Sequence, residues 1–93
     1  MVIGLLQVTL SIPEARSLKD KRAVLRSLRD RCLNRMNVSV AEVGDQDLWQ
    51  SAHLAFVTVA AEKATAEKRL SELAQFLSRD PRHVLVEVRS EFF

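Results

Sequence analysis

VIGLLQVTLSIPEARSLKDKRAVLRSLRDRCLNR, residues 2–35, contains the change of hydrophobic period that decides the fold. Residues 2–12 alternate after Leu5 between apolar and polar side chains, which is typical of a half-buried strand. Pro13 ends that strand, and Ser17 followed by Asp20 is a helix N-cap signal. From Leu18 to about Arg35 apolar residues recur within one arc of about 80° when placed at about 100° per residue. The arc consists of Leu18, Leu25, Leu28, Cys32 and Met36, with Val24 at its margin. The stretch therefore predicts a strand followed by an amphipathic helix.

The rest of the chain predicts two strands, a second helix and a last strand. We expect strands at Asn37–Val43, Trp49–Ala61 and His83–Arg89, and a helix at about Lys63–Arg79. Turn residues fill 44–48, and Asp80-Pro81 ends the second helix because the residue before proline is disfavoured in the α region. The order βαββαβ predicts an α+β, ferredoxin-like sandwich spanning residues 1–93 as one domain. In that fold a four-stranded antiparallel sheet, in the order 4-1-3-2, carries both helices on one face.

This architecture leaves the second sheet face without helices, and apolar residues there would favour self-association. In the last strand we assign Val84, Val86 and Val88 to the covered face. Residues 49–61 are apolar on both sides of the strand, so a slip of one residue would exchange Phe56 with Val57. The candidates for the uncovered face, and for the interface of a homodimer, are Ile3, Leu5, Leu54, Phe56 and Leu85.

Positive charge is concentrated on the first predicted helix. Residues 13–35 contain eight of the fourteen Lys and Arg residues and three acidic ones, a local charge of +5 in a chain whose net charge is +2. Helical spacing places Lys19, Arg22, Arg26 and Arg29 on one ridge along a flank of the apolar arc. The ridge is roughly 15 Å long, enough to follow two or three backbone phosphates. There are two alternatives to phosphate binding. The ridge could be a solvated helix face whose aliphatic side-chain segments cover the edge of the core, or it could bind an acidic protein.

Three further polar residues have open interpretations. Lys21 falls inside the apolar arc, where it must extend to solvent, pair with a carboxylate such as Glu42, or mark a site. Trp49 and Gln46 lie at one end of the sheet, where the indole could stack on a base or contact a partner. A lone Trp beside a hairpin also commonly packs over the sheet edge.

No catalytic or metal-binding constellation is present in the sequence. His53 and His83 have no Cys, Asp or Glu partner at a metal-ligand spacing. Cys32 falls on the apolar arc, which predicts a buried, inert thiol. The connection PEARS lacks the glycine of the phosphate-cradling loop that acylphosphatases place there. We therefore expect a protein without enzymatic activity, cofactor or metal. With no secretory signal and no apolar run approaching the ~20 residues of a membrane span, we also expect a cytoplasmic protein without membrane contact.

Two strings, SLKDKR at 17–22 and NVSVAEVGDQDLWQ at 37–50, resemble the YlxP-like family of small bacterial proteins of unknown function. The resemblance covers essentially the whole chain. It implies a ferredoxin-like fold and a cytoplasmic protein, and it brings no catalytic residue with it. Genes of this family often adjoin those for transcription and translation factors and for ribosome maturation factors, which suggests RNA or ribosome work by association. The resulting hypothesis is a non-catalytic accessory protein that binds RNA or the ribosome through the basic ridge. The alternative is a homodimeric protein-interaction or small-molecule regulatory domain that binds no nucleic acid.

Overall fold

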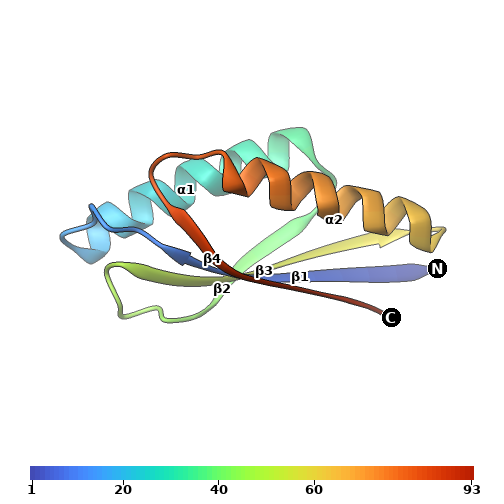
Figure 1. Cartoon of the computed structure of the whole chain (residues 1–93), viewed down its shortest axis with the longest axis horizontal. Coiled ribbons are helices and arrows are strands. Elements are labelled where there is room, and N and C mark those ends of the chain that lie inside the picture. The colour runs from blue at the N-terminus through green and yellow to red at the C-terminus, as the bar shows by residue number, and fades with distance from the viewer.

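The predicted ferredoxin-like topology is confirmed. The computed structural model describes residues 1–93. Its elements are β1 (Val2–Ser11), α1 (Leu18–Arg35), β2 (Ser39–Gly44), β3 (Ser51–Ala60), α2 (Lys63–Ser78) and β4 (Val84–Phe92). The strands form one antiparallel sheet in the order β2-β3-β1-β4, and both helices lie on the same side of it (Figure 1). The two edges of the sheet are therefore β2 and β4.

Local signals set the start of α1 where the sequence predicts it. The Ser17 hydroxyl accepts a hydrogen bond from the Asp20 amide at 3.0 Å, which satisfies one free N–H of the first turn. The Asp20 carboxylate in turn accepts a hydrogen bond from the Arg16 amide at 2.9 Å. The two hydrogen bonds fix the first turn of the helix to the residues that precede it. The helix ends at Arg35, and Met36 returns to an extended conformation. Neither α1 nor α2 is long and apolar enough to cross a membrane.

The core lies between the sheet and the two helices. It is formed by the buried row of β1 together with apolar residues of β3 and both helices: Leu6, Val8, Leu10, Ile12, Leu28, Cys32, Ala52, Leu54, Phe56, Leu70, Leu73 and Leu77. Helix α2 approaches β1 closely at Gly4, where an added Cβ would lie 3.1 Å from Leu70 Cδ1 and 3.2 Å from Thr58 Cγ2. A larger residue at Gly4 would therefore push α2 away from the sheet.

The predicted placement of Leu54 and Phe56 on the uncovered face is wrong. Both are buried beneath the helices, and Phe56 has no exposed surface. The antiparallel register explains the difference: Leu6 lies opposite Phe56 and Val8 opposite Leu54, and directly opposed residues share a face. Because β1 has a single apolar row, it dictates which side of β3 faces the helices. Val57, the residue that a one-residue slip exchanges with Phe56, takes the uncovered side.

The predicted face of Leu85 is also wrong, and a β-bulge is the reason. Leu10 pairs with Leu85 and Thr9 with Glu87, so Val86 has no partner in β1. Because of this extra residue, the side chains of β4 that precede it point to the opposite faces of the sheet from those that simple alternation predicts. Leu85 consequently packs against the core, and Val84 is exposed. Beyond the bulge Val88 lies on the helix side as predicted, but β4 is an edge strand and leaves it partly uncovered.

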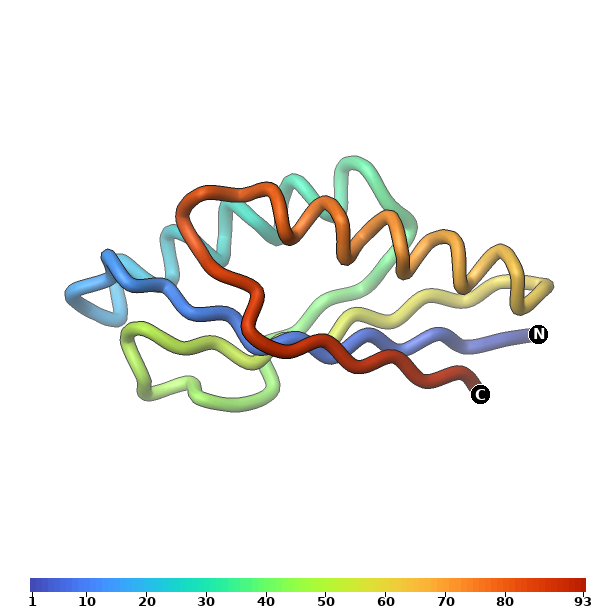
Figure 2. Tube along the Cα trace, in the orientation of Figure 1, coloured from blue at the N-terminus to red at the C-terminus, as the bar shows by residue number.

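The uncovered sheet face nevertheless carries an apolar cluster. Register places Ile3 opposite Val59 and Leu5 opposite Val57, and Val59 is 55% exposed. The cluster lies at the end of the sheet where the two chain termini meet, since Ile3 and Phe93 exchange backbone hydrogen bonds of 3.0 and 2.9 Å (Figure 2). The predicted positions of Ile3 and Leu5 agree with this arrangement. Their part in self-association stays a prediction.

Candidate nucleic-acid interface

The four residues of the predicted ridge lie on the solvent side of α1. Lys19, Arg22, Arg26 and Arg29 are all exposed, and none of them forms an ion pair within the chain. No side-chain hydrogen bond engages their ammonium or guanidinium groups either. We call these four residues the basic ridge. Their cationic groups are therefore available to an external anion.

Other cations of the same helix are bound inside the molecule. Arg31 pairs with Asp80, and Arg35 lies over the ring of Phe76 with its guanidinium carbon 5.1 Å from the ring centroid. Lys21 pairs with Glu42. The structure thus separates the basic residues of α1 into a set that stabilises the fold and a set, the basic ridge, that does not.

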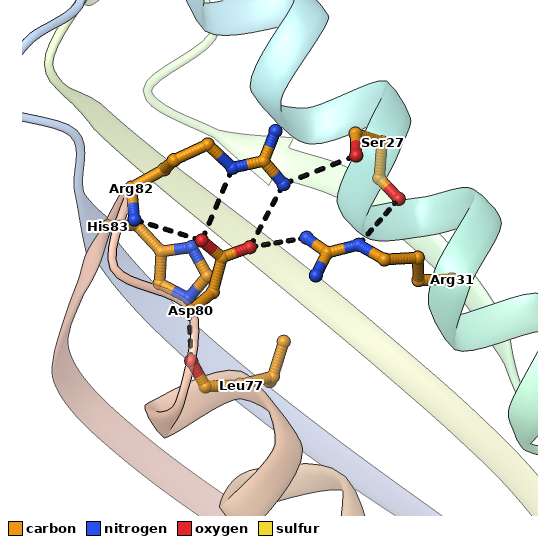
Figure 3. A network of polar contacts seen from close by, with 6 residues as sticks. All are labelled: Ser27, Arg31, Leu77, Asp80, Arg82 and His83. Carbon is orange, nitrogen blue, oxygen red and sulfur yellow. Dashed lines mark hydrogen bonds and ion pairs between the residues drawn. The ribbon is translucent and has the colours of Figure 1, made fainter.

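Asp80 is the centre of a polar network, which Figure 3 shows. Its buried carboxylate accepts hydrogen bonds from the Arg31 and Arg82 guanidinium groups and, at 2.9 Å, from the Arg82 amide. Hydrogen bonding to Arg82 holds the pKa of Asp80 well below its usual range, and Arg31 adds to the effect against the cost of burial. The pKa of Arg82 is raised by the same contact. Since Arg82 also donates to Ser27 Oγ at 3.2 Å, the network fastens α1 to the α2–β4 connection.

Lys21 has three partners, and they lie in the second of the two family-like strings. Its side chain is 1% exposed, and its ammonium lies 2.8 Å from Glu42 Oε2. The same group donates to the carbonyl oxygens of Asp45 and Leu48 at 2.6 and 2.7 Å. Of the alternatives that the sequence leaves open, pairing with Glu42 is confirmed. Lys21 therefore joins the start of α1 to β2 and the β2–β3 connection, which lie at the same end of the molecule (Figure 2).

The β2–β3 connection is fixed by further contacts. Asp45 has a φ of 57°, the left-handed conformation that Asp tolerates better than most residues, and its carboxylate accepts from Ser51 Oγ at 2.9 Å. The Gln50 amide donates to the carbonyls of Pro13 and Ala15 at 3.0 and 3.1 Å. Gln46 donates back to the Glu42 carbonyl at 3.2 Å. The connection is consequently ordered against the strand–helix junction that precedes α1.

Trp49 lies in this connection, half exposed and beside Leu48 and Gln50. It lines a shallow surface depression that includes no residue of the basic ridge. The structure therefore does not bring Trp49 and Gln46 together with the ridge in a common cavity. Their predicted roles in base stacking and partner contact stay predictions.

A cavity of about 260 Å³ separates α1 from the edge strand β2. Its rim includes three residues of the ridge, Arg22, Arg26 and Arg29. The remaining lining residues are Leu25, Leu28, Val40, Ala41, Glu42, Leu54 and Phe56. Leu25 and Val40 are half-buried walls, whereas Phe56 lies beneath them in the core. No pattern in the sequence predicts this cavity, because its existence depends on how far α1 lies from β2.

Cys32 is buried in the core, and both histidines hydrogen-bond to other parts of the chain. Cys32 is buried as predicted, and its burial raises the thiol pKa to about 11, partly offset by the charge of Arg31. His53 shares a 3.2 Å hydrogen bond with Gln7 on the uncovered face, and buried His83 is 2.7 Å from the Leu77 carbonyl. No group of three or more His, Cys, Asp or Glu side chains could hold a metal ion.

Comparisons with known proteins place these features in context. Residues 3–90 match the family model described as protein of unknown function (DUF503). The uncharacterized protein YlxP of Bacillus subtilis (strain 168) is 35% identical over 92 residues, which cover 99% of this chain and 100% of that relative. A solved structure, the de novo designed protein Foldit4, has a TM-score of 0.55 at 11% identity, covering 100% of this chain and 97% of the designed one. The likeness to the designed protein concerns the fold alone.

Proposed function

This chain belongs to the DUF503 family, whose function is unknown, and we propose that it is a non-catalytic RNA-binding accessory protein whose basic ridge contacts backbone phosphates. The family membership confirms the resemblance to YlxP-like proteins. The proposal places the protein in the cytoplasm, on RNA or on the ribosome.

The observation that carries the proposal is the division of the α1 cations. Lys21, Arg31 and Arg35 each have a partner within the chain, and these contacts stabilise the fold. The basic ridge has none, although long cationic side chains aligned on one flank repel each other. Contacts between such Lys and Arg side chains and backbone phosphates supply essentially all of the affinity of non-specific nucleic-acid binding and a large share of specific binding. The ridge matches this requirement better than it matches a role in folding.

The test is RNA binding by a variant in which Lys19, Arg22, Arg26 and Arg29 are all replaced by Gln. We expect its affinity for single-stranded RNA to fall by at least about tenfold at moderate salt, because phosphate contacts dominate affinity. The matched control replaces by Gln four exposed cations outside α1: Lys63 and Lys68 of α2, Arg79 directly after that helix, and Arg89 of β4. Both variants have the same net charge, so only a ridge-specific loss supports the proposal.

Equal losses in the two variants would reduce the effect to net charge and contradict a defined phosphate site. Purification of the protein from cells, with and without ribonuclease, provides the second arm. Co-purifying proteins that remain after ribonuclease treatment, together with full RNA affinity in the ridge variant, would favour an acidic protein as the partner of the ridge.

We also propose that the chain forms a homodimer through the apolar cluster of the uncovered sheet face. The cluster comprises Ile3, Leu5, Val57 and Val59, which register places side by side. Beside it β4 presents Glu87, Arg89 and Glu91 on the same face, opposite Thr9, Gln7 and Leu5. One Arg lies between two Glu, so a second copy related by a twofold axis can place the Arg89 of each copy beside a Glu of the other. This face lies on the opposite side of the sheet from α1, and dimerisation leaves the basic ridge free.

Sedimentation velocity tests the homodimer. A Val57→Glu variant places a charge at the centre of the cluster, where an interface tolerates it least, and should sediment as a monomer. Val43→Glu, which changes a valine of the edge strand β2 that lies outside the cluster and is 51% exposed against 37% for Val57, should leave the dimer intact. A wild-type protein that sediments as a monomer at micromolar concentration would refute a tight dimer.

A further inference from the structure

We propose that the cavity between α1 and β2 receives one unpaired RNA nucleotide whose base carries an exocyclic amino group. This inference rests on the proposed function and adds two properties to it. The RNA must be single-stranded where it meets the protein, and uracil is the disfavoured base.

The cavity and the phosphate site are continuous. Arg22, Arg26 and Arg29 belong both to the basic ridge and to the rim of the cavity. A nucleotide whose phosphate contacts the rim therefore has its base directed toward the gap between helix and strand. The apolar walls, Leu25 and Val40, offer their surfaces to the faces of a base. A base within a duplex is stacked on both faces and paired along its edge, so it cannot enter.

The dimensions suit a single base. The volume of about 260 Å³ lies just below the roughly 300 Å³ at which sites for drug-sized ligands begin. Strand β2 is an edge of the sheet, and its outer backbone groups have no strand partner. Free N–H and C=O groups beside an apolar wall can bond the edge of an unstacked base. The site thus combines cations for the phosphate, apolar surface for the base faces and polar groups for the base edge.

Glu42 supplies the preference among bases. It lines the cavity, and Lys21 binds its Oε2 atom at 2.8 Å, while its second oxygen has no hydrogen-bond partner in the chain. The buried Lys21 ammonium balances the carboxylate charge, so Glu42 does not cancel the attraction of the rim for phosphate. A carboxylate oxygen only accepts hydrogen bonds, and it pairs well with the amino group of cytosine, adenine or guanine. The only donor on the uracil edge, N3–H, is flanked by two carbonyl oxygens that the carboxylate repels.

Binding of fluorescent oligo(C), oligo(A) and oligo(U) of equal length, and of a hairpin duplex, tests the inference. We expect oligo(C) and oligo(A) to bind wild-type protein about tenfold more tightly than oligo(U), and the duplex to bind no better than oligo(U). Val40→Phe fills the cavity and should remove the advantage of oligo(C). Glu42→Gln offers both a donor and an acceptor, so it should bring oligo(U) and oligo(C) to similar affinities. Val43→Phe, on the same strand but outside the cavity, is the matched control.

The outcomes separate this inference from the proposed function. Equal binding of all four RNAs, unchanged in Val40→Phe but lost in the ridge variant, would overturn the nucleotide cavity and leave the ridge in place. Absence of binding to every RNA would overturn both. Free CMP serves as a further probe: binding as tight as that of oligo(C) would overturn an RNA strand as the occupant. Circular dichroism melting of each variant verifies that a lost preference is not lost structure.

Discussion

Replacement of Lys21 by methionine removes the most buried cation of the protein while keeping a long, flexible, apolar stem. Methionine fills most of the space of the lysine side chain, so the loss is confined to the ammonium. That group holds one carboxylate at 2.8 Å and two backbone carbonyls at 2.6 and 2.7 Å. The variant therefore leaves Glu42 without its counter-charge and the carbonyls of Asp45 and Leu48 without their donor.

The expected destabilisation follows from these contacts. Removing one partner of a buried ion pair costs about 3–5 kcal/mol, because the remaining charge stays desolvated. The Glu42 side chain is 25% exposed and can recover some hydration, which favours the lower end of that range. A domain of this size is stable by about 5–14 kcal/mol. A loss of about 3 kcal/mol would therefore remove a large share of the stability and lower the melting temperature by about 12 °C or more.

Urea unfolding followed by far-UV circular dichroism measures the loss. Lys19→Met is the matched control, since Lys19 is exposed and has no partner in the chain, and it should change the free energy of unfolding by less than about 0.5 kcal/mol. The double variant Lys21→Met, Glu42→Met should recover part of the stability, because it removes the orphaned charge as well. A Lys21→Met protein within about 1 kcal/mol of wild type would refute the structural role of this contact.

Three further predictions concern the core and the Asp80 network. Cys32 should resist alkylation at pH 8 in the native protein, where burial raises its pKa to about 11, and react fully in urea; rapid native labelling would contradict its burial. Asp80→Asn should cost about 3 kcal/mol at pH 7. Because the pKa of Asp80 is lower in the folded than in the unfolded state, wild-type stability should fall as pH drops below about 4, and the variant should lose less over that range in melting experiments. Gly4→Val should destabilise by about 1–3 kcal/mol, since its side chain would collide with Leu70, and an unchanged urea midpoint would count against the close packing of α2.

The elements of the fold were predictable because their signals are local. Helix α1 runs from Leu18 to Arg35 as expected, since the N-cap and the 3.6-residue period both lie within the segment itself. The faces of β3 were not predictable, because a strand that is apolar on both sides has no alternation to read. Its orientation follows from pairing with β1, a contact between distant segments. The bulge at Val86 likewise arises from the mismatch between two paired strands and has no signature in either one.

The candidate site shows the same division between local and distant information. Helical spacing placed the basic ridge on one flank of α1, where its four residues are exposed, and it placed Lys21 inside the apolar arc. Extension of Lys21 to solvent, the interpretation that the arc favoured, is wrong, because the side chain is 1% exposed and paired. The three partners of Lys21 lie 21 to 27 residues further along the chain. Only the folded structure therefore shows whether the side chain extends to solvent, pairs with a carboxylate or belongs to a binding site. Asp80 was recognised only as a helix terminator, since its two arginine partners are assembled from α1 and the α2–β4 connection. The cavity beside the ridge depends on the separation of α1 and β2, which no local pattern encodes.

The salt dependence of RNA binding tests the phosphate contacts of the basic ridge most directly. The slope of log K against log salt counts the phosphates that a protein neutralises, at about 0.7 per contact for a single strand. If Lys19, Arg22, Arg26 and Arg29 each contact a phosphate, every Gln substitution in the ridge should flatten the slope by about that amount. The four matched control substitutions outside α1 should not. A folded quadruple ridge variant with the slope and affinity of wild type would contradict the account.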